Sequence, residues 1–151
     1  MAQRFPNILY IHSHDTGRYI QPYGYPVPTP RLQQFAEEGI VFRQAFCAAP
    51  MCSASRASLL TGQYPHSNGM LGLAHRGFSL NDYSHHLVHT LHNVGYYTVL
   101  IGEQHIAKEP DLIGYDRVVK VRNHHADVVV PRTQDILDSL PAEAPFFLSV
   151  G

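Results

Sequence analysis

The sequence has little charge and almost no imbalance between positive and negative residues. Charged residues make up 15% of its 151 residues, and the net charge is −1 with histidine neutral. It therefore has no basic field to attract nucleic acid and no polybasic patch to attract a membrane surface. We expect neither nucleic acid nor a membrane among its partners.

Cysteines and long apolar runs are also scarce. Cys47 and Cys52 are the only cysteines, too few for the usual disulfide framework of a secreted protein. No apolar run approaches the ~20 residues that span a bilayer. The N-terminal residues lack the charged and apolar regions of a signal peptide. We therefore expect a soluble, cytoplasmic protein.

Histidine, by contrast, is abundant, with 11 residues. Histidine is both a metal ligand and a proton carrier near neutral pH, so this excess favours the presence of a functional site. The length and the 44% of hydrophobic residues suffice for one domain with a real core.

Strand-like and helix-like segments alternate along the chain. Strands are predicted at residues 7–12, 40–46, 96–102 and 146–150, and helices at 29–39, 53–62, 85–95 and 131–140. This alternation is typical of an α/β fold with a mainly parallel sheet flanked by helices. Sites in such sheets gather at the carboxyl ends of the strands.

Two of the predicted helices carry clear end signals. Thr29 is the expected N-cap of the first helix and Gly39 its stop. The second helix is expected to end at Gly62, with Leu59 and Leu60 packing inward.

Cys52 is predicted to lie at the N-terminus of the second helix. The N–H groups and the dipole at that end stabilise an anion, either a thiolate or a bound oxyanion. Arg56 follows about one turn later and offers a two-pronged hydrogen-bond donor to a tetrahedral anion. The spacing also permits two structural alternatives, which are a half-buried cysteine beside a surface arginine and a Cys47–Cys52 disulfide.

The segment Cys52–Arg56, with Leu60–Gly62 after it, resembles the sulfatase signature Cys-x-Pro/Ala-Ser-Arg with a downstream Leu-Thr-Gly. The resemblance covers nearly the whole chain, and its blocks are residues 6–17, 29–62, 89–106 and 145–151. The sequence "HSNGMLGL" at 66–73 is most similar to the N-sulfoglucosamine sulfohydrolase (sulfamidase) branch.

This resemblance implies a fold, a modification and a reaction. Residues 1–151 would form the N-terminal part of a single, incomplete catalytic domain of the alkaline phosphatase superfamily. Cys52 would be oxidised to formylglycine by a maturation enzyme, and with Arg56 and the proton-transfer residue His105 it would form the catalytic set. The reaction would be hydrolysis of a sulfate ester or sulfamate on a small molecule or saccharide.

The resemblance also implies a divalent metal. The family usually carries two adjacent aspartates that bind calcium, and here the pair is His14-Asp15. We expect both residues to be metal ligands, with zinc or manganese as alternatives to calcium because a nitrogen ligand suits calcium poorly. His14 has two other readings, as a substrate contact or as a hydrogen-bonded structural residue.

A second departure lies at residues 103–105, where the family's Lys-x-His reads Glu-Gln-His. A carboxylate at position 103 would repel a sulfate unless it is protonated, paired or pointed away. Lys108 is a candidate to replace the missing lysine. Other candidate substrate-binding residues are His66, His75 and Arg76, for which a solvated polar loop is the alternative.

Two alternative functions stay open on the sequence. One is a phosphate or phosphonate monoester hydrolase of the same superfamily, and the other is an inert fragment that self-associates. The apolar strand at 146–150 is expected to expose an edge that pairs with another copy, giving a homo-oligomer. We expect the 151 residues alone not to hydrolyse sulfate esters.

Overall fold

The computed structural model describes residues 5–151 as two compact units. The first comprises the residues up to His12 together with Cys47–Gly151, and the second comprises Ser13–Phe46. The first unit contains the whole sheet. The second contains the short helix η1 (Gln21–Tyr23) and the helix α1 (Pro30–Glu38).

Four parallel strands form the sheet of the first unit. In sequence they are β1 (Ile8–Ile11), β2 (Tyr97–Ile101), β3 (Arg117–Val119) and β4 (Phe146–Val150). Their spatial order is β1-β4-β2-β3, so β4 separates β1 from β2. The parallel α/β architecture predicted from the sequence is confirmed.

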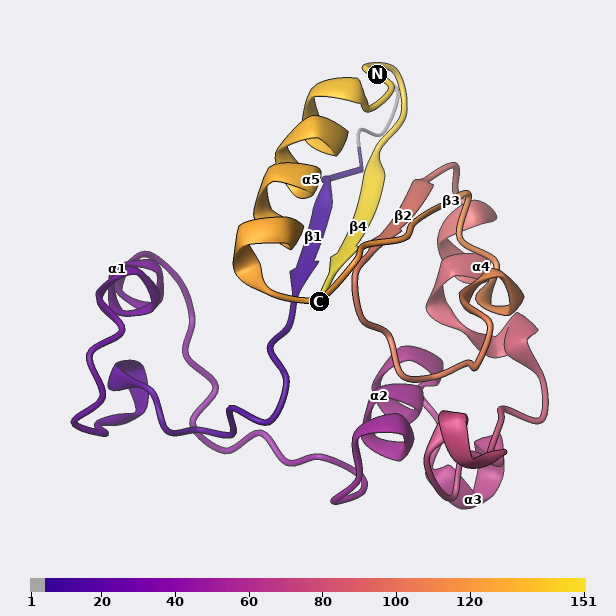
Figure 1. The fold of residues 1–151 in the computed structure, drawn as a ribbon, viewed down its shortest axis with the longest axis horizontal. Coiled ribbons are helices and arrows are strands. Elements are labelled where there is room, and N and C mark those ends of the chain that lie inside the picture. The colour runs from indigo at the N-terminus through magenta and orange to yellow at the C-terminus, as the bar shows by residue number, and fades with distance from the viewer. Residues whose placement is uncertain (1–4) are drawn as a thin grey trace. The chain divides into compact units, whose positions relative to one another are not determined.

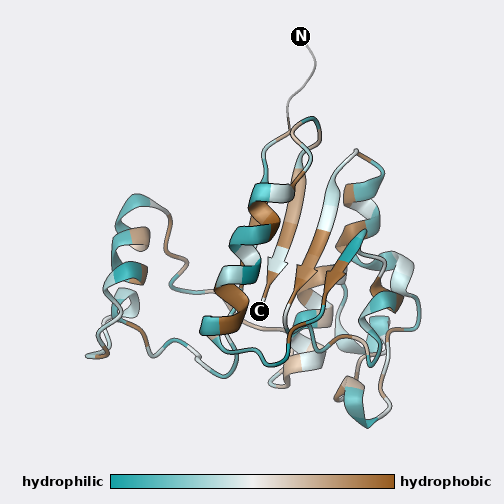
Figure 2. Ribbon diagram, turned by 45° about the horizontal axis from the view of Figure 1, so that its top comes forward, coloured by the Kyte–Doolittle hydropathy of each residue, from teal (hydrophilic) through white to brown (hydrophobic). Residues whose placement is uncertain are grey.

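Helices cover both faces of this sheet. On one face α5 (Ala126–Ser139) packs through Val129 and Ile136 against apolar residues of β2 and β4 (Figure 1). On the other face, residues of α2 (Cys52–Thr61) and α4 (Leu87–His92) join Phe147 in the larger core cluster. Figure 2 shows mainly brown, apolar strands beside α5, whose ribbon carries both teal and brown residues.

The remaining elements of the first unit are short helices in the connections. They are α3 (Pro65–Asn68), η2 (Ala74–Arg76), η3 (Tyr83–His85) and η4 (Pro110–Ile113). No helix among the described residues is long and apolar enough to cross a membrane.

Helix ends were predicted better than helix faces. Helix α1 begins at Pro30 and is followed by Gly39, as expected, although Thr29 makes no side-chain capping bond. Gly62 ends α2 as expected, but of its two leucines only Leu60 is buried. Leu59 is 64% exposed because the buried face of α2 runs through its alanines and serines.

The predicted start of the last helix was wrong. Pro131 reads as a first-turn proline, yet α5 begins five residues earlier at Ala126 and contains Pro131 in its interior. A proline in the second turn removes an N–H that would otherwise bond within the helix, but it does not break this one.

The strand predicted at residues 40–46 is absent. The segment has an alternating pattern, but a strand also needs a neighbour for its backbone groups, and the described residues of the second unit contain no sheet. Three apolar side chains of the segment are consequently exposed, Ile40, Phe42 and Phe46.

The expected exposed edge on the strand at 146–150 is also wrong. Strand β4 is paired on both sides, with β1 and with β2, and four of its five residues are buried. The edges belong instead to β1 and to β3, a three-residue strand that the sequence pattern did not predict. This removes the reason to expect self-association through β4.

A buried histidine gives the fold a predictable pH response. The side chain of His86 is fully buried at the N-terminus of α4, where its Nδ1 accepts the N–H of Val88. Burial, followed by the charge of His89, lowers the pKa of His86 to about 4. The ordinary histidine pKa is about 6.5, so between these values the unfolded chain takes up a proton that the folded chain does not.

We therefore expect the free energy of unfolding to fall as the pH decreases from about 6.5 to about 4, with a His86 contribution on the order of 3 kcal/mol. Urea unfolding at several pH values measures this slope. His86→Asn is the matched control, because its Oδ1 can still accept the Val88 N–H but does not titrate. An unchanged slope in His86→Asn would contradict the assignment.

Candidate active site

The carboxyl ends of three strands are joined by hydrogen bonds around Gly151. The N–H of Gly151 donates to the Ile101 carbonyl, and the Glu103 N–H donates to the Gly151 carbonyl. The His12 N–H donates to the Val150 carbonyl. The residues that follow β1 and β2 are therefore fixed relative to the end of β4, although they are distant in sequence.

Helix α2 carries the signature and begins at Cys52. The first helical bond runs from the Ser55 N–H to the Met51 carbonyl, and Gly62 closes the last turn in a left-handed conformation. Cys52 is half-buried and is a free thiol, as is the exposed Cys47, so a disulfide between them is excluded. The predicted position of Cys52 at a helix N-terminus is confirmed.

Arg56 lies one turn along α2 and contacts the end of β1. Its Nη1 is 2.5 Å from Nδ1 of His12. Because a guanidinium can only donate, Nδ1 of His12 must be the acceptor. The charge of Arg56 also reaches Tyr10, where burial raises the pKa of the hydroxyl and Arg56 partly offsets that rise.

His105 is presented by a braced loop that follows β2. Its backbone has φ = 54°, in the left-handed region that non-glycine residues rarely adopt. The Gln104 side chain holds the loop, since its Oε1 accepts the N–H of Ala107 at 2.8 Å and its Nε2 donates to the Ala107 carbonyl at 2.6 Å. Strained backbone held by its surroundings is a feature of functional sites.

The carboxylate of Glu103 is paired with groups of this same loop and with His124. Its Oε1 accepts the N–H groups of Gln104 and His105 at 3.0 and 3.2 Å. Its Oε2 lies 3.5 Å from Nε2 of His105 and 3.8 Å from Nε2 of His124. Burial raises the pKa of Glu103, but these imidazoles and N–H groups together lower it by more than burial raises it. The pKa of Glu103 therefore lies below the ordinary value.

Cys52 and His105 lie close together in the structure although they are 53 positions apart in the sequence. A side-chain nitrogen of His105 lies within 4.8 Å of the Cys52 Sγ. The ring of His75 lies 6.1 Å from the ring of His105. The segment before His75 is tied to α2 because the buried Ser53 hydroxyl accepts the Ala74 N–H. The structure thus gathers Cys52, Arg56, His75 and His105 around the start of α2.

Three other predicted residues belong to the first unit. His66 lines a mainly apolar cavity of about 570 Å³ whose lining includes Met51 and Ala54 but neither Cys52 nor Arg56. Arg76 and Lys108 are exposed. Glu103 is paired within its loop, which answers how a carboxylate is tolerated at its position without invoking Lys108.

His14 and Asp15 belong to the second unit. Asp15 has φ = 53°, a second left-handed backbone at a predicted site residue. Its Oδ2 lies 3.1 Å from Nδ1 of His14, and both side chains are exposed. Calcium takes six to eight oxygen ligands, so one carboxylate and one imidazole do not make a calcium site without further ligands.

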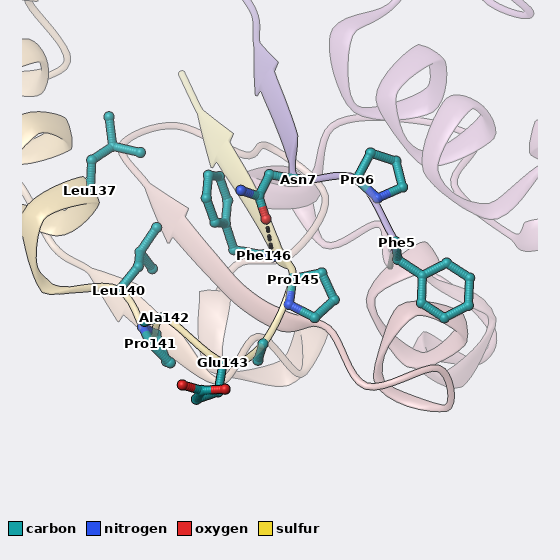
Figure 3. A pocket seen from close by; sticks show the side chains of 11 residues that line it. Phe5, Pro6, Asn7, Leu137, Leu140, Pro141, Ala142, Glu143, Pro145 and Phe146 are labelled. Carbon is teal, nitrogen blue, oxygen red and sulfur yellow. Dashed lines mark hydrogen bonds between the residues drawn. The ribbon is translucent and has the colours of Figure 1, made fainter. Parts of the chain in front are cut away.

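Another cavity, of about 780 Å³, lies at the opposite, amino-terminal end of the strands. It is lined by residues 5–7, Leu137 and residues 140–146 (Figure 3). Glu143 is the only charged residue of this lining, so the cavity holds a carboxylate that would repel an oxyanion and no cation that would attract one. This cavity is therefore not the candidate active site.

Two residues of the site escaped sequence reasoning. His12 was assigned to the end of a predicted strand, and its position at a carboxyl end was the available signal. His124 precedes α5 and has no pattern that links it to Glu103, so only the fold reveals that contact.

Comparison with known proteins identifies the family. The sulfatase family model matches residues 6–150. The chain therefore belongs to the sulfatase family. A solved structure of a protein in complex with its substrate D-glucosamine-2-N,6-O-disulfate has the same fold, with a TM-score of 0.81 at 23% identity. That similarity covers 97% of this chain and 34% of the other.

Similar curated proteins are sulfatases of several kinds. The arylsulfatase of Clostridium perfringens is 38% identical, over 62% of this chain and 19% of its own length. The N-acetylgalactosamine-6-sulfatase of Canis lupus familiaris is 34% identical, over 72% of this chain and 23% of its own length. The human N-sulphoglucosamine sulphohydrolase is 39% identical, over 55% of this chain and 17% of its own length. These identities do not single out the sulfamidase branch, and the chain spans about a fifth of these relatives.

Proposed function

We propose that this chain carries the nucleophile, cation and base of a sulfatase that hydrolyses a sulfate ester or sulfamate through formylglycine at position 52. One observation carries the proposal in a chain of this family. The Cys52 Sγ lies within 4.8 Å of a nitrogen of His105, and Arg56 is one turn away on the same helix.

Each of these residues has a separate chemical role. Formylglycine at position 52 supplies a hydrated aldehyde, one hydroxyl of which attacks the sulfur. The bond from sulfur to the leaving alcohol or amine breaks, and the leaving group takes up the proton that the attacking hydroxyl loses. Arg56 stabilises negative charge at that position with the N-terminus of α2, and His12 holds its guanidinium. His105 then accepts the proton of the remaining hydroxyl at position 52. The carbon–oxygen bond to sulfate breaks, so that sulfate is released and the aldehyde is regenerated.

The proposed substrate is a sulfated saccharide or other small molecule. The names of two similar proteins, N-acetylgalactosamine-6-sulfatase and N-sulphoglucosamine sulphohydrolase, denote sulfated amino sugars. Residues 66–73 support the narrower proposal of a sulfamidase-like substrate. His75 is a candidate substrate contact, because it lies beside His105.

A divalent metal held by Asp15 and His14 stays a prediction. The two side chains suit a metal ion only with ligands beyond these two, and the nitrogen of His14 favours zinc or manganese over calcium. Metal analysis of the 151-residue chain is expected to find weak or substoichiometric binding. Stoichiometric, tight binding would contradict the need for further ligands.

Mass spectrometry of the Cys52 peptide tests the proposal directly. In the active protein from its native host we expect loss of the thiol and reactivity towards hydrazides, with hydrolysis of an aryl sulfate. The same preparation tested on an aryl phosphate distinguishes the phosphatase alternative. A free thiol at position 52 in a preparation that hydrolyses sulfate esters would exclude the formylglycine mechanism.

A further inference from the structure

Glu103 divides its two carboxylate oxygens between the loop and two imidazoles. Oε1 accepts hydrogen bonds from two backbone N–H groups of its own loop. Oε2 faces Nε2 of His105 at 3.5 Å and Nε2 of His124 at 3.8 Å. The two histidines come from different segments, the loop after β2 and the residues before α5, so Glu103 joins those segments at one oxygen.

This arrangement has a consequence for the protonation of His105. A carboxylate that faces Nε2 stabilises the tautomer in which Nε2 carries the hydrogen, and it also fixes the ring orientation. Nδ1 is then the basic nitrogen. If His105 is the proton acceptor, the Glu103 carboxylate determines that Nδ1 of His105 takes the proton.

His124 acts on the same carboxylate from the outer side. Its side chain is 48% exposed, whereas those of Glu103 and His105 are 24% and 26% exposed. A carboxylate held by only one imidazole and two N–H groups of its own loop can rotate, whereas a second imidazole restrains it. The ring of His75 also lies near His105, at 6.1 Å between ring centroids.

We propose that His124 is a positioning residue that holds Glu103, which in turn orients His105 as the base. This inference rests on the proposed sulfatase function for its kinetic consequence. It assigns a role to Glu103 where the family resemblance implied a lysine, and it assigns His124 to the site without any contact to substrate.

A double-mutant cycle in the full-length protein tests the inference. With an aryl sulfate, Glu103→Gln is expected to lower kcat about 10–100-fold and His124→Gln about 3–10-fold, with KM unchanged, in the range for groups that orient a functional ligand. Because His124 acts through Glu103, the double variant should match Glu103→Gln. The matched control is His125→Gln, the adjacent exposed histidine, which is expected to retain wild-type kcat.

The outcomes separate a positioning role from a structural one. His124→Lys should recover most of the lost kcat, because an ammonium can still pair with the carboxylate. Additive losses in the double variant, or equal losses in His124→Gln and His125→Gln, would overturn the inference.

Nitrogen-15 spectra of histidine-labelled protein provide a readout that does not need activity. The His105 signals, assigned by their absence in His105→Gln, should show the Nε2–H tautomer in the wild type and a mixture in Glu103→Gln and His124→Gln. Unchanged tautomers in both variants would also overturn the inference. The expected tautomer shift in a protein without sulfatase activity would instead leave the positioning intact and refute the proposed function.

Discussion

In the full-length protein, Cys52→Ala is expected to eliminate sulfate-ester hydrolysis, with a loss of kcat of ~10³-fold or more. Alanine removes the sulfur-bearing group from which the formylglycine would be made. Helix α2 should persist, because alanine favours helices and its buried side, including Ala57 and Leu60, is untouched. Steady-state kinetics and thermal unfolding measure the two effects.

Cys47→Ala is the matched control for this variant. Cys47 is exposed and precedes the helix, whereas Cys52 is half-buried beside His105. We expect Cys47→Ala to keep wild-type kcat and the same formylglycine content. Substantial residual activity in Cys52→Ala would mean that the nucleophile lies elsewhere, while a large loss in Cys47→Ala would show that the exposed thiol has an unassigned role.

The second large effect is expected for Gly102→Ala. Gly102 has φ = 81°, and a Cβ added there would lie 1.9 Å from the carbonyl oxygen of Gly151. That oxygen accepts the Glu103 N–H, so the clash falls on hydrogen-bonded backbone that cannot move without parting the ends of β2 and β4. We expect a destabilisation of about 3–5 kcal/mol, measured by urea unfolding.

Gly77→Ala separates the effect of space from that of the backbone angle. Gly77 has φ = 95°, but a Cβ there meets no atom within 4 Å. Only the left-handed conformation is then penalised, by about 1–2 kcal/mol. Equal losses in the two variants would show that the close approach of Gly102 to Gly151 contributes nothing to stability.

The sequence predicts the fold well where two signals agree. Apolar runs between turn residues located β1, β2 and β4. Helical spacing together with start and stop residues located the ends of α1 and α2. The segment at residues 40–46 had only alternation, and alternation says nothing about whether a partner strand is available. The short strand β3 exists because β2 provides a ladder, from Val99 to Ile101, along which three residues can pair.

The sequence predicted which residues belong to the candidate site, but it did not predict how most of them lie relative to one another. Cys52 and Arg56 share one helix, so their spacing follows from local structure. The approach of His105 to Cys52 depends on the loop after β2, and that loop is braced by side-chain bonds from Glu103 and Gln104. Such bonds leave no periodic pattern, and the pairing of Glu103 with His124 joins segments whose relation is visible only after folding.

The position of β4 in the sheet also bears on the order in which the chain acquires its structure during synthesis. Strand β1 leaves the ribosome before β4, which is its neighbour in the sheet. The Asn7–Phe146 hydrogen bond that accompanies this pair joins residues 139 positions apart. Contacts at such separations form slowly because the intervening chain must lose entropy first. His12, which holds Arg56, and Glu103, which faces His105, both take their positions from residues 150–151. A nascent chain stalled before β4 would therefore already contain every candidate catalytic residue of the first unit while lacking the strand that aligns them.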